Sequence, residues 1–172
     1  MKNPAGEPLE IERKYLILRP EEALLDTKCQ RRIEIEQLYL LSTPRTGSRR
    51  LRHSRWADGE AWYYSEKQRV TDLTRIERER EISPAEYAGL LAEADPKSRP
   101  IRKTRWCIPY AGRMLEIDLF PFWTRQAFCE VELPAEEIVP ELPDWLSVIR
   151  EVSGDRRYNN NSLARNIPAE EA

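Results

Sequence analysis

Residues 9–17 read Leu-Glu-Ile-Glu-Arg-Lys-Tyr-Leu-Ile, and this short stretch decides which kind of fold the chain adopts. Side chains of a β-strand point alternately to its two faces, so residues two apart share a face. The alternation of apolar and charged residues therefore predicts a half-buried strand rather than a helix. One face would carry Leu9, Ile11, Tyr15 and Ile17, and the other Glu10, Glu12 and Lys14.

The same alternation returns along the chain and predicts a β-rich protein. The predicted strands cover residues 9–17, 32–41, 49–55, 61–69, 74–82, 103–109, 113–120 and 129–133. A set of this size in a chain of ordinary domain length favours a barrel or a sandwich. Residues 1–172 are predicted to form a single domain, with a core from about residue 9 to residue 164.

Helices are predicted between the strands. The clearest covers residues 84–94, because Ser83 is a good N-cap, Pro84 suits the first helical position and Glu86 completes a capping box. Weaker patterns predict helices at residues 20–26, 135–139 and 144–152, and a short turn around residues 162–166.

The composition excludes several kinds of chemistry. Of the 172 residues, 34% are charged, yet the formal net charge is only -2, and the chain holds one His and six Gly. A single His cannot build a His-rich metal centre, and no glycine-rich phosphate-binding loop is present. A pI near 5.7 argues against nucleic acid as the main partner.

Cysteine content and hydropathy bear on where the protein works. The three cysteines are odd in number and show no CxxC spacing, so neither a zinc knuckle nor a disulfide framework is predicted. No apolar run is long enough to cross a bilayer, and residues 1–10 do not read as a signal peptide. We therefore predict a cytoplasmic protein with no membrane partner.

Charged residues occur in like pairs at positions i and i+2, which places both members on one strand face. An open sheet would turn this face to water, which is the commoner arrangement, whereas a closed barrel would make it a tunnel. Crowded like charges are destabilising, so paired acids favour a bound cation and paired bases favour a bound anion. Carboxylates suit Mg²⁺ or Mn²⁺ and guanidinium groups suit phosphate, so a metal-bridged polyphosphate is the predicted ligand. The pairs are Glu10 and Glu12, Arg50 and Arg52, Glu77 and Glu79, Lys103 and Arg105, Glu116 and Asp118, and Glu130 and Glu132.

These pairs, in this order, resemble the motifs of the CYTH family, also called triphosphate tunnel metalloenzymes. Residues 10–14 are similar to the ExExK signature that opens the family's fold, and the likeness extends over residues 9–164. The ordered set is far more specific than ExExK alone. One departure is that Asn159 and Asn161 stand where small bacterial members often carry Lys. The further matches are RxR at 50–52, a Lys at 67, RxExE at 75–79, KxR at 103–105, ExD at 116–118, ExE at 130–132 and RYxNxxLA at 157–164.

The resemblance implies an α+β protein in which eight antiparallel strands close into a β-barrel, or tunnel, with helices packed outside. It implies a divalent-metal-dependent hydrolase of triphosphates, and we favour inorganic tripolyphosphate because the charged pairs come without an evident nucleobase reader. The alternatives are a class IV adenylyl cyclase, a thiamine or nucleoside triphosphatase, or a non-catalytic polyphosphate-binding module. The expected partner is a small-molecule triphosphate. A homodimer is suggested only by the general frequency of dimers among soluble proteins.

The resemblance also distributes roles over the charged residues. A purely structural role for the basic residues is also possible, in which they form ion pairs with the carboxylates. The two roles are compatible if metal and phosphate displace these ion pairs when they bind. Two Mg²⁺ or Mn²⁺ ions would be held by Glu10, Glu12, Glu116, Asp118, Glu130 and Glu132. The phosphates would be bound by Lys14, Arg50, Arg52, Lys67, Arg75, Lys103, Arg105 and Arg157. Catalysis would involve Lys14, Arg52, Glu77 and Glu79, with Glu77, Glu79 and Glu116 near a second metal or the attacking water.

Other charged residues are assigned to the outer surface by strand parity. His53 lies opposite Arg50 and Arg52, which argues against a catalytic role. Arg78 and Arg80 face away from the paired glutamates of their strand. Glu34 and Glu36 match no motif and are predicted to be solvated.

The face assignment predicts unequal effects of two Arg substitutions. Arg52→Ala should weaken tripolyphosphate binding by about tenfold or more, because a charge-assisted hydrogen bond to phosphate is lost. Arg78→Ala should change it by less than about twofold, as is usual for an exposed side chain. Calorimetric titration of both variants with tripolyphosphate measures the difference, and equal losses would refute the assignment of faces.

Overall fold

The computed structural model describes residues 2–43 and 47–172, and within these ranges the chain is dominated by antiparallel strands. No helix in these ranges is long and apolar enough to cross a membrane. Each predicted strand is present, most with ends shifted by one or two residues. The strands are β1 (Leu9–Leu18), β2 (Arg31–Leu40), β3 (Ser48–Trp56), β4 (Gly59–Arg69), β5 (Thr74–Ile82), β6 (Ile101–Tyr110), β7 (Arg113–Leu119), β8 (Gln126–Glu132) and β9 (Val148–Glu151).

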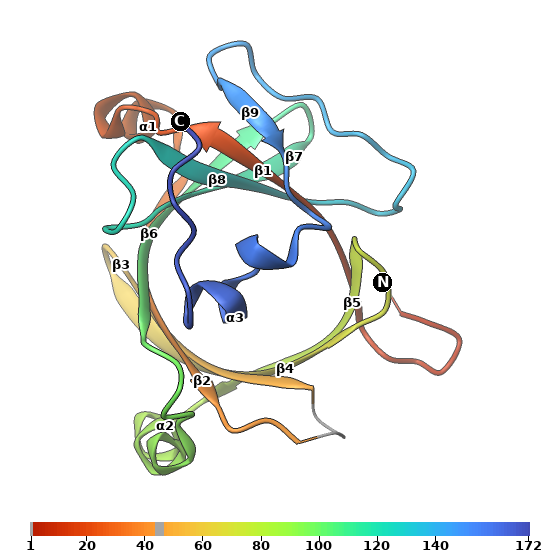
Figure 1. The fold of residues 1–172 in the computed structure, drawn as a ribbon, viewed down its shortest axis with the longest axis vertical. Helices are drawn as coiled ribbons and strands as arrows, with labels where there is room; N and C mark the ends of the chain where they lie inside the picture. The colour runs from red at the N-terminus through yellow and green to blue at the C-terminus, as the bar shows by residue number, and fades with distance from the viewer. Residues whose placement is uncertain (1, 44–46) are drawn as a thin grey trace.

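The strands β1 to β8 close into a barrel, as predicted, and β1 closes it. The hydrogen-bonded order is β5-β4-β3-β2-β6-β7-β8-β1, and β1 also pairs with β5. The first residues of β1 pair with β5, with Glu10 opposite Arg75, and the rest of the strand pairs with β8, with Glu12 opposite Glu132. Viewed along its axis, the sheet forms a ring (Figure 1).

The prediction of a helix at residues 144–152 is wrong, because this segment contains β9. The strand pairs with β1 at Tyr15–Ile17, along the edge that β5 leaves free after Ile11. Two β-branched residues, Val148 and Ile149, begin β9 and favour extended backbone. Hydrogen bonding to the free edge of β1 thus favours a strand here over the helix that the local sequence pattern predicts.

The helix predicted at residues 135–139 is also wrong, and a turn replaces it. The side chain of Arg13 donates hydrogen bonds to backbone carbonyl groups that would otherwise accept hydrogen bonds within a helix. Its Nε donates to the carbonyl of Ile138 at 3.0 Å, and its Nη2 donates to the carbonyl of Glu136 at 2.8 Å. Prolines at positions 134 and 140 further limit a helix between them.

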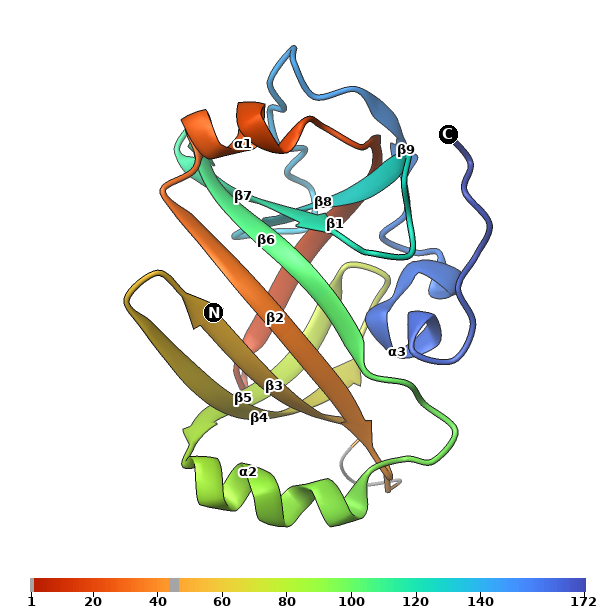
Figure 2. The same ribbon diagram turned by 90° about the vertical axis from the view of Figure 1, so that its left-hand side faces the viewer.

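Three helices are present among the described residues, and two of them cover the outside of the barrel. They are α1 (Glu22–Lys28) and α2 (Pro84–Leu90), which continues as a 3-10 turn, η1 (Leu91–Glu93). The oxygen of Ser83 accepts a hydrogen bond from the backbone N–H of Glu86, as the capping pattern predicts. Figure 2 shows α1 and α2 on opposite outer sides, and the short α3 (Asn160–Leu163) at one end of the barrel.

Apolar residues on the outer faces of the strands pack under these helices. A large cluster joins the outer faces of β1, β6, β7 and β8 with Leu25 of α1 and Leu146. A smaller cluster joins Leu51 and Ile82 with Tyr87 and Leu90 beside α2. On strands such as β1, β7 and β8, covering the apolar outer face leaves the charged face to point inward.

A third apolar cluster closes one end of the barrel from inside. Leu16, Tyr39, Ile101 and Phe128 lie at strand positions whose side chains point inward. The chain packs back on them through the segment that contains η2 (Arg156–Tyr158) and α3. Figure 1 shows this segment inside the ring of strands. Tyr158, Leu163 and Ala164 of this segment are almost fully buried.

This closing cluster predicts a strong effect of one substitution. Leu16 is fully buried opposite Phe128, so Leu16→Ala should lower the free energy of unfolding by about 2–5 kcal/mol. Leu18→Ala is the matched control two residues along β1, because 47% of Leu18 is exposed, and it should cost about 0.5 kcal/mol or less. Urea unfolding measures both, and a Leu16→Ala loss no larger than the control would contradict the closed end.

Candidate functional site

The interior of the barrel holds a charged cavity of about 410 Å³. Each strand from β1 to β8 contributes at least one side chain to it, as period-two alternation requires once the outer faces are covered. The end beside α3 is bounded by residues 153–156 and 159–161.

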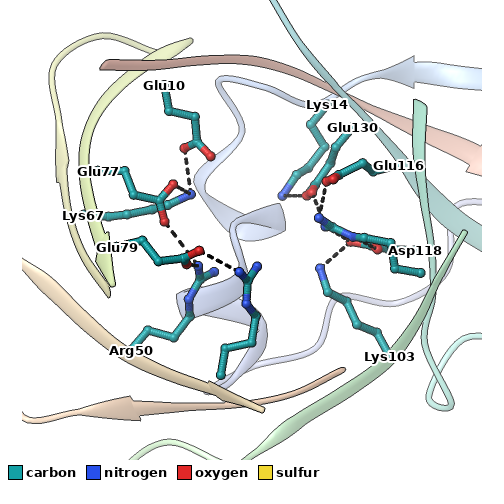
Figure 3. A network of polar contacts seen from close by, with 12 residues as sticks. Glu10, Lys14, Arg50, Lys67, Glu77, Glu79, Lys103, Glu116, Asp118 and Glu130 are labelled. Carbon is teal, nitrogen blue, oxygen red and sulfur yellow. Dashed lines mark hydrogen bonds and ion pairs between the residues drawn. The ribbon is translucent and has the colours of Figure 1, made fainter. Parts of the chain in front are cut away.

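One group of ion pairs lies on the β3, β4 and β5 side of the cavity. Lys67 Nζ is 2.7 Å from Glu10 Oε2 and 3.1 Å from Glu77 Oε2. Arg50 Nη2 is 3.3 Å from Glu77 Oε1 and 3.5 Å from Glu79 Oε2. Burial raises the pKa of Glu10, although Lys67 opposes the shift. We call this group the Lys67 network; it consists of Glu10, Arg50, Arg52, Lys67, Glu77 and Glu79 (Figure 3).

A second group lies across the cavity, on β6, β7 and β8. Arg105 Nη2 is 2.6 Å from Glu130 Oε2, and its Nε is 2.6 Å from Asp118 Oδ1. Lys14 Nζ of β1 is 2.7 Å from Glu130 Oε1. Burial alone would raise the pKa of Glu130, but Lys14 and the other cations outweigh it and lower that pKa well below its ordinary value. The Arg105 network consists of Lys14, Lys103, Arg105, Glu116, Asp118 and Glu130 (Figure 3).

Two acids of the cavity stand outside both networks. Glu12 and Glu132 are cross-strand neighbours, and neither side chain makes an ion pair or hydrogen bond within the described residues. Burial, followed by the charges of Glu130 and Glu10, raises the pKa of Glu12 to about 7. Burial and the surrounding glutamates also raise the pKa of Glu132. Among the described residues these carboxylates therefore have no directly paired cation, although the charges of Lys14 and Lys67 lower the pKa of Glu12 in part.

Basic groups without a carboxylate partner line the same cavity. Across residues 2–43 and 47–172, the side chains of Arg75 and Arg156 make no ion pair or hydrogen bond. Arg75 lies between Glu10 of β1 and Arg69 of β4 in the sheet register. Arg52 pairs with Glu79 through its Nη2, but its buried Nε has no hydrogen-bond partner in the same ranges, and burial lowers the pKa of this guanidinium group. The cavity thus offers unsatisfied positive charge as well as unsatisfied negative charge.

The donors in the cavity fit a hard divalent cation by their chemistry. Such ions prefer carboxylate oxygens, and Glu12 and Glu132 supply carboxylates that no cation balances. In the described ranges, no three acidic, His or Cys side chains converge as a ready metal site. The other acids of the cavity face Lys and Arg instead, so a cation would bind by displacing an ion pair.

The sequence-predicted site residues lie around this cavity, with two exceptions. Asp118 has no exposed surface and is enclosed by Lys103 and Arg105 beneath the cavity wall. Arg157, the other exception, lies near the closed end. Those that line the cavity are Glu10, Glu12, Lys14, Arg50, Arg52, Lys67, Arg75, Glu77, Glu79, Lys103, Arg105, Glu116, Glu130 and Glu132.

Arg157 points away from the cavity, whereas its neighbour Arg156 lines it. The Nε and Nη2 atoms of Arg157 donate to Asp155 at 3.0 and 2.6 Å, and 65% of its side chain is exposed. Successive residues of the η2 turn point to different sides. Strand parity gives no guidance there, so the sequence pattern could not distinguish the two arginines.

Several cavity residues were missed by the sequence reasoning. Ser65 and Arg69 share strand parity with Lys67 and could have been found by extending the pattern along β4. Gln37 and Tyr39 also line the cavity, but β2 carries no lumenal charge that would have marked its face. Ser153, Gly154 and the asparagines 159–161 come from the closing segment, by which we mean residues 153–164 around η2 and α3. Only the tertiary structure brings this segment to the cavity.

The residues assigned to the outer surface lie there. Arg78 pairs with Glu7, outside the barrel. The ring of His53 stacks on Trp62 with a centroid distance of 4.7 Å. Arg80, Glu34 and Glu36 likewise contact Glu86, Thr104 and Arg102 on the outer face.

Comparison with known proteins points to triphosphatases. No protein-family model matches the chain. The chain is similar to an inorganic triphosphatase of Acetivibrio thermocellus, with 35% identity over 105 residues. The match covers 60% of this chain and 65% of that relative.

Solved structures share the fold. The crystal structure of the inorganic triphosphatase NE1496 has a TM-score of 0.54 and 26% identity, covering 93% of this chain and 97% of that one. The PH1819 protein from Pyrococcus horikoshii OT3 has a TM-score of 0.57 at 21% identity, covering 77% of this chain and 79% of that one, and it shows the fold alone.

The closed barrel of eight antiparallel strands has acids and bases facing its lumen, so its interior is a charged tunnel. The barrel, the ordered charged pairs and the similar proteins together confirm the resemblance drawn from the sequence. The chain is therefore similar to the CYTH family, the triphosphate tunnel metalloenzymes, in its fold as well as in its motifs.

The raised pKa of Glu12 predicts that this residue destabilises the metal-free protein at alkaline pH. The folded pKa of about 7 lies above the ordinary value of 4.5, so folding favours the protonated acid and stability falls as pH rises from 4.5 through 7. In EDTA, Glu12→Gln should therefore raise the free energy of unfolding at pH 8 by on the order of 2 kcal/mol and leave it nearly unchanged at pH 4.5.

Urea unfolding at both pH values measures this difference. Glu34→Gln, on the outer face of β2, is the control and should shift stability by about 0.5 kcal/mol or less at either pH. A lower free energy of unfolding for Glu12→Gln at pH 8 would contradict the prediction. It would mean that a cationic group of the folded protein stabilises the Glu12 carboxylate.

Proposed function

We propose that the protein hydrolyses inorganic tripolyphosphate with the help of a divalent metal ion and releases orthophosphate. The observation that carries the proposal is the coexistence of uncompensated acids, Glu12 and Glu132, with bases such as Arg75 that lack an anion. A triphosphate bridged by a metal supplies both missing charges in one ligand. Similarity to the inorganic triphosphatases of A. thermocellus and NE1496 supports the same activity.

The reaction breaks a phosphoanhydride bond. The oxygen of water bonds to a terminal phosphorus, the bond from that phosphorus to the bridging oxygen breaks, and the protons of water pass to product oxygens or solvent. Orthophosphate and pyrophosphate result. A bound divalent ion would polarise the phosphate and increase the acidity of a coordinated water.

The basic side chains bind the phosphates and offset charge in the transition state. Arg50, Arg52 and Lys67 enter the cavity from β3 and β4, and Lys14 and Arg105 enter it from β1 and β6. When phosphate oxygens replace the carboxylates as their partners, the acids of the Lys67 network are released. Glu77 and Glu79 then become available to hold the attacking water.

The proposed metal ligands are Glu10, Glu12 and Glu132, which extend from β1 and β8. Glu116 and Glu130 would join them when the Arg105 network opens. For Asp118 we propose a supporting role, because its carboxylate is fully buried and holds Lys103 and Arg105 in place.

The cavity favours an inorganic substrate over a nucleotide. Among the described residues that line it, Tyr39 is the one aromatic side chain, and it is 5% exposed within the closing cluster. A nucleobase or thiazole ring would therefore find no open aromatic face to stack on.

The proposal includes a cytoplasmic location and a single catalytic domain over residues 1–172. The cysteines at positions 29, 107 and 129 are all free, as is usual in a reducing compartment. The assembly state stays a prediction from general frequency alone.

Assays of purified protein test this function. With Mg²⁺ or Mn²⁺, the protein should release orthophosphate from tripolyphosphate, and EDTA should abolish the release. Glu10→Gln and Glu132→Gln should each lower kcat/KM by about a hundredfold or more, because Gln keeps the shape but not the charge needed to hold the cation.

Glu34→Gln is the control on the outer face and should retain wild-type turnover. ATP and thiamine triphosphate belong in the same panel, with phosphate, pyrophosphate and cyclic AMP as products to measure. The proposal would be overturned by any of three results. Cyclic AMP from ATP would indicate an adenylyl cyclase, and a preference for thiamine triphosphate would indicate a thiamine triphosphatase. Binding without turnover under either metal would indicate a polyphosphate-binding module.

A further inference from the structure

Arg52 reaches into the cavity from β3 and rests on the ring of Tyr63. The two residues are cross-strand neighbours on β3 and β4. The guanidinium carbon lies 4.7 Å from the centroid of the Tyr63 ring, which is the range of a cation–π contact. On its other side, Arg52 Nη2 is 2.7 Å from Glu79 Oε1.

The ion pair with Glu79 is opposed by the surroundings of Arg52. Its guanidinium group lies near two other cations, Arg50 and Arg105, and together with burial they lower its pKa. Its carboxylate partner, Glu79, is shared with Arg50 at 3.5 Å. A neutral aromatic face stabilises the cation without consuming a carboxylate.

The contact leaves the buried Nε of Arg52 unused. Its Nε is buried and has no hydrogen-bond partner in the described ranges, although the residue lines the cavity. Buried donors of this kind are normally satisfied, so an unsatisfied one in a binding cavity marks a place for a ligand oxygen. A phosphate oxygen is the acceptor that the proposed substrate would bring.

The ring of Tyr63, rather than its hydroxyl group, makes this contact. Across the part of the chain that the structure describes, the Tyr63 hydroxyl makes no hydrogen bond. Tyr64, the next residue on β4, faces outward and offers a close comparison. Its ring lies beneath Arg49 and Arg80, at 5.5 and 5.3 Å, on the outer surface of the barrel.

We propose that Tyr63 is a positioning residue that holds Arg52 against the cavity wall with its free Nε available to a substrate phosphate. The inference rests on the proposed hydrolysis of tripolyphosphate. Because Tyr63 acts through a group that binds the phosphate before and during reaction, it contributes mainly to substrate affinity.

Steady-state kinetics with tripolyphosphate and Mg²⁺ test the proposal. Tyr63→Leu should raise KM by about five- to thirtyfold, the range expected from loss of one partly desolvated cation–π contact, with kcat within about twofold of wild type. Tyr63→Phe should restore wild-type KM, because it keeps the ring. Tyr64→Leu removes an equivalent ring outside the barrel and should leave KM unchanged.

Calorimetric titration with tripolyphosphate, without added metal, gives a readout independent of turnover and should show the same order of affinities. An unchanged KM and affinity in Tyr63→Leu, an equal loss in Tyr63→Phe, or an equal loss in Tyr64→Leu would each overturn the role of Tyr63. These outcomes are distinct from failure of the proposed function, in which the wild-type protein would itself neither bind nor hydrolyse tripolyphosphate.

Discussion

Closure of the sheet by β1 is the constraint on which the rest of the structure depends. Its first residues pair with β5 and its remainder pairs with β8, so one strand joins both edges of the sheet. Apolar side chains on the outer faces are covered by α1, α2 and the segment before β9. The charged side chains of the inner faces therefore cannot turn to solvent and must accommodate one another inside the barrel.

Enclosed charge explains why the lumen is organised into two networks. Burying a charge is costly unless a partner is present, and both the Lys67 network and the Arg105 network combine acids with bases. Within residues 2–43 and 47–172, Glu12 and Glu132 have no ion-pair partner on their strand pair, and neither does Arg75 nearby. This arrangement stores unfavourable electrostatic energy that a ligand carrying both charges would relieve. A site that is held by β-strands on all sides can keep such groups apart without collapsing.

Much of the fold and of the candidate site could be predicted from strand parity. The prediction worked because residues two apart on a strand share a face, so residues such as Arg52 and Arg78 are assigned to the inside or the outside by their position alone. It failed where tertiary contacts choose the backbone. Residues 144–152 look helical locally, but an open edge of β1 recruits Val148–Glu151 as a strand. Residues 135–139 form a turn because Arg13, more than a hundred positions away, takes their carbonyl groups.

The sequence by itself determined which side chains share a face, because alternation is a property of the extended backbone. It also determined that acids and bases would occur in paired sets. Only the tertiary structure decided which acids find a basic partner, because this depends on register between strands that are distant in the chain. Register places Glu12 opposite Glu132 but brings Lys14 to Glu130. Likewise, only the folded closing segment decided that Arg156 rather than Arg157 lines the cavity, because a turn has no fixed period from which side-chain direction can be deduced.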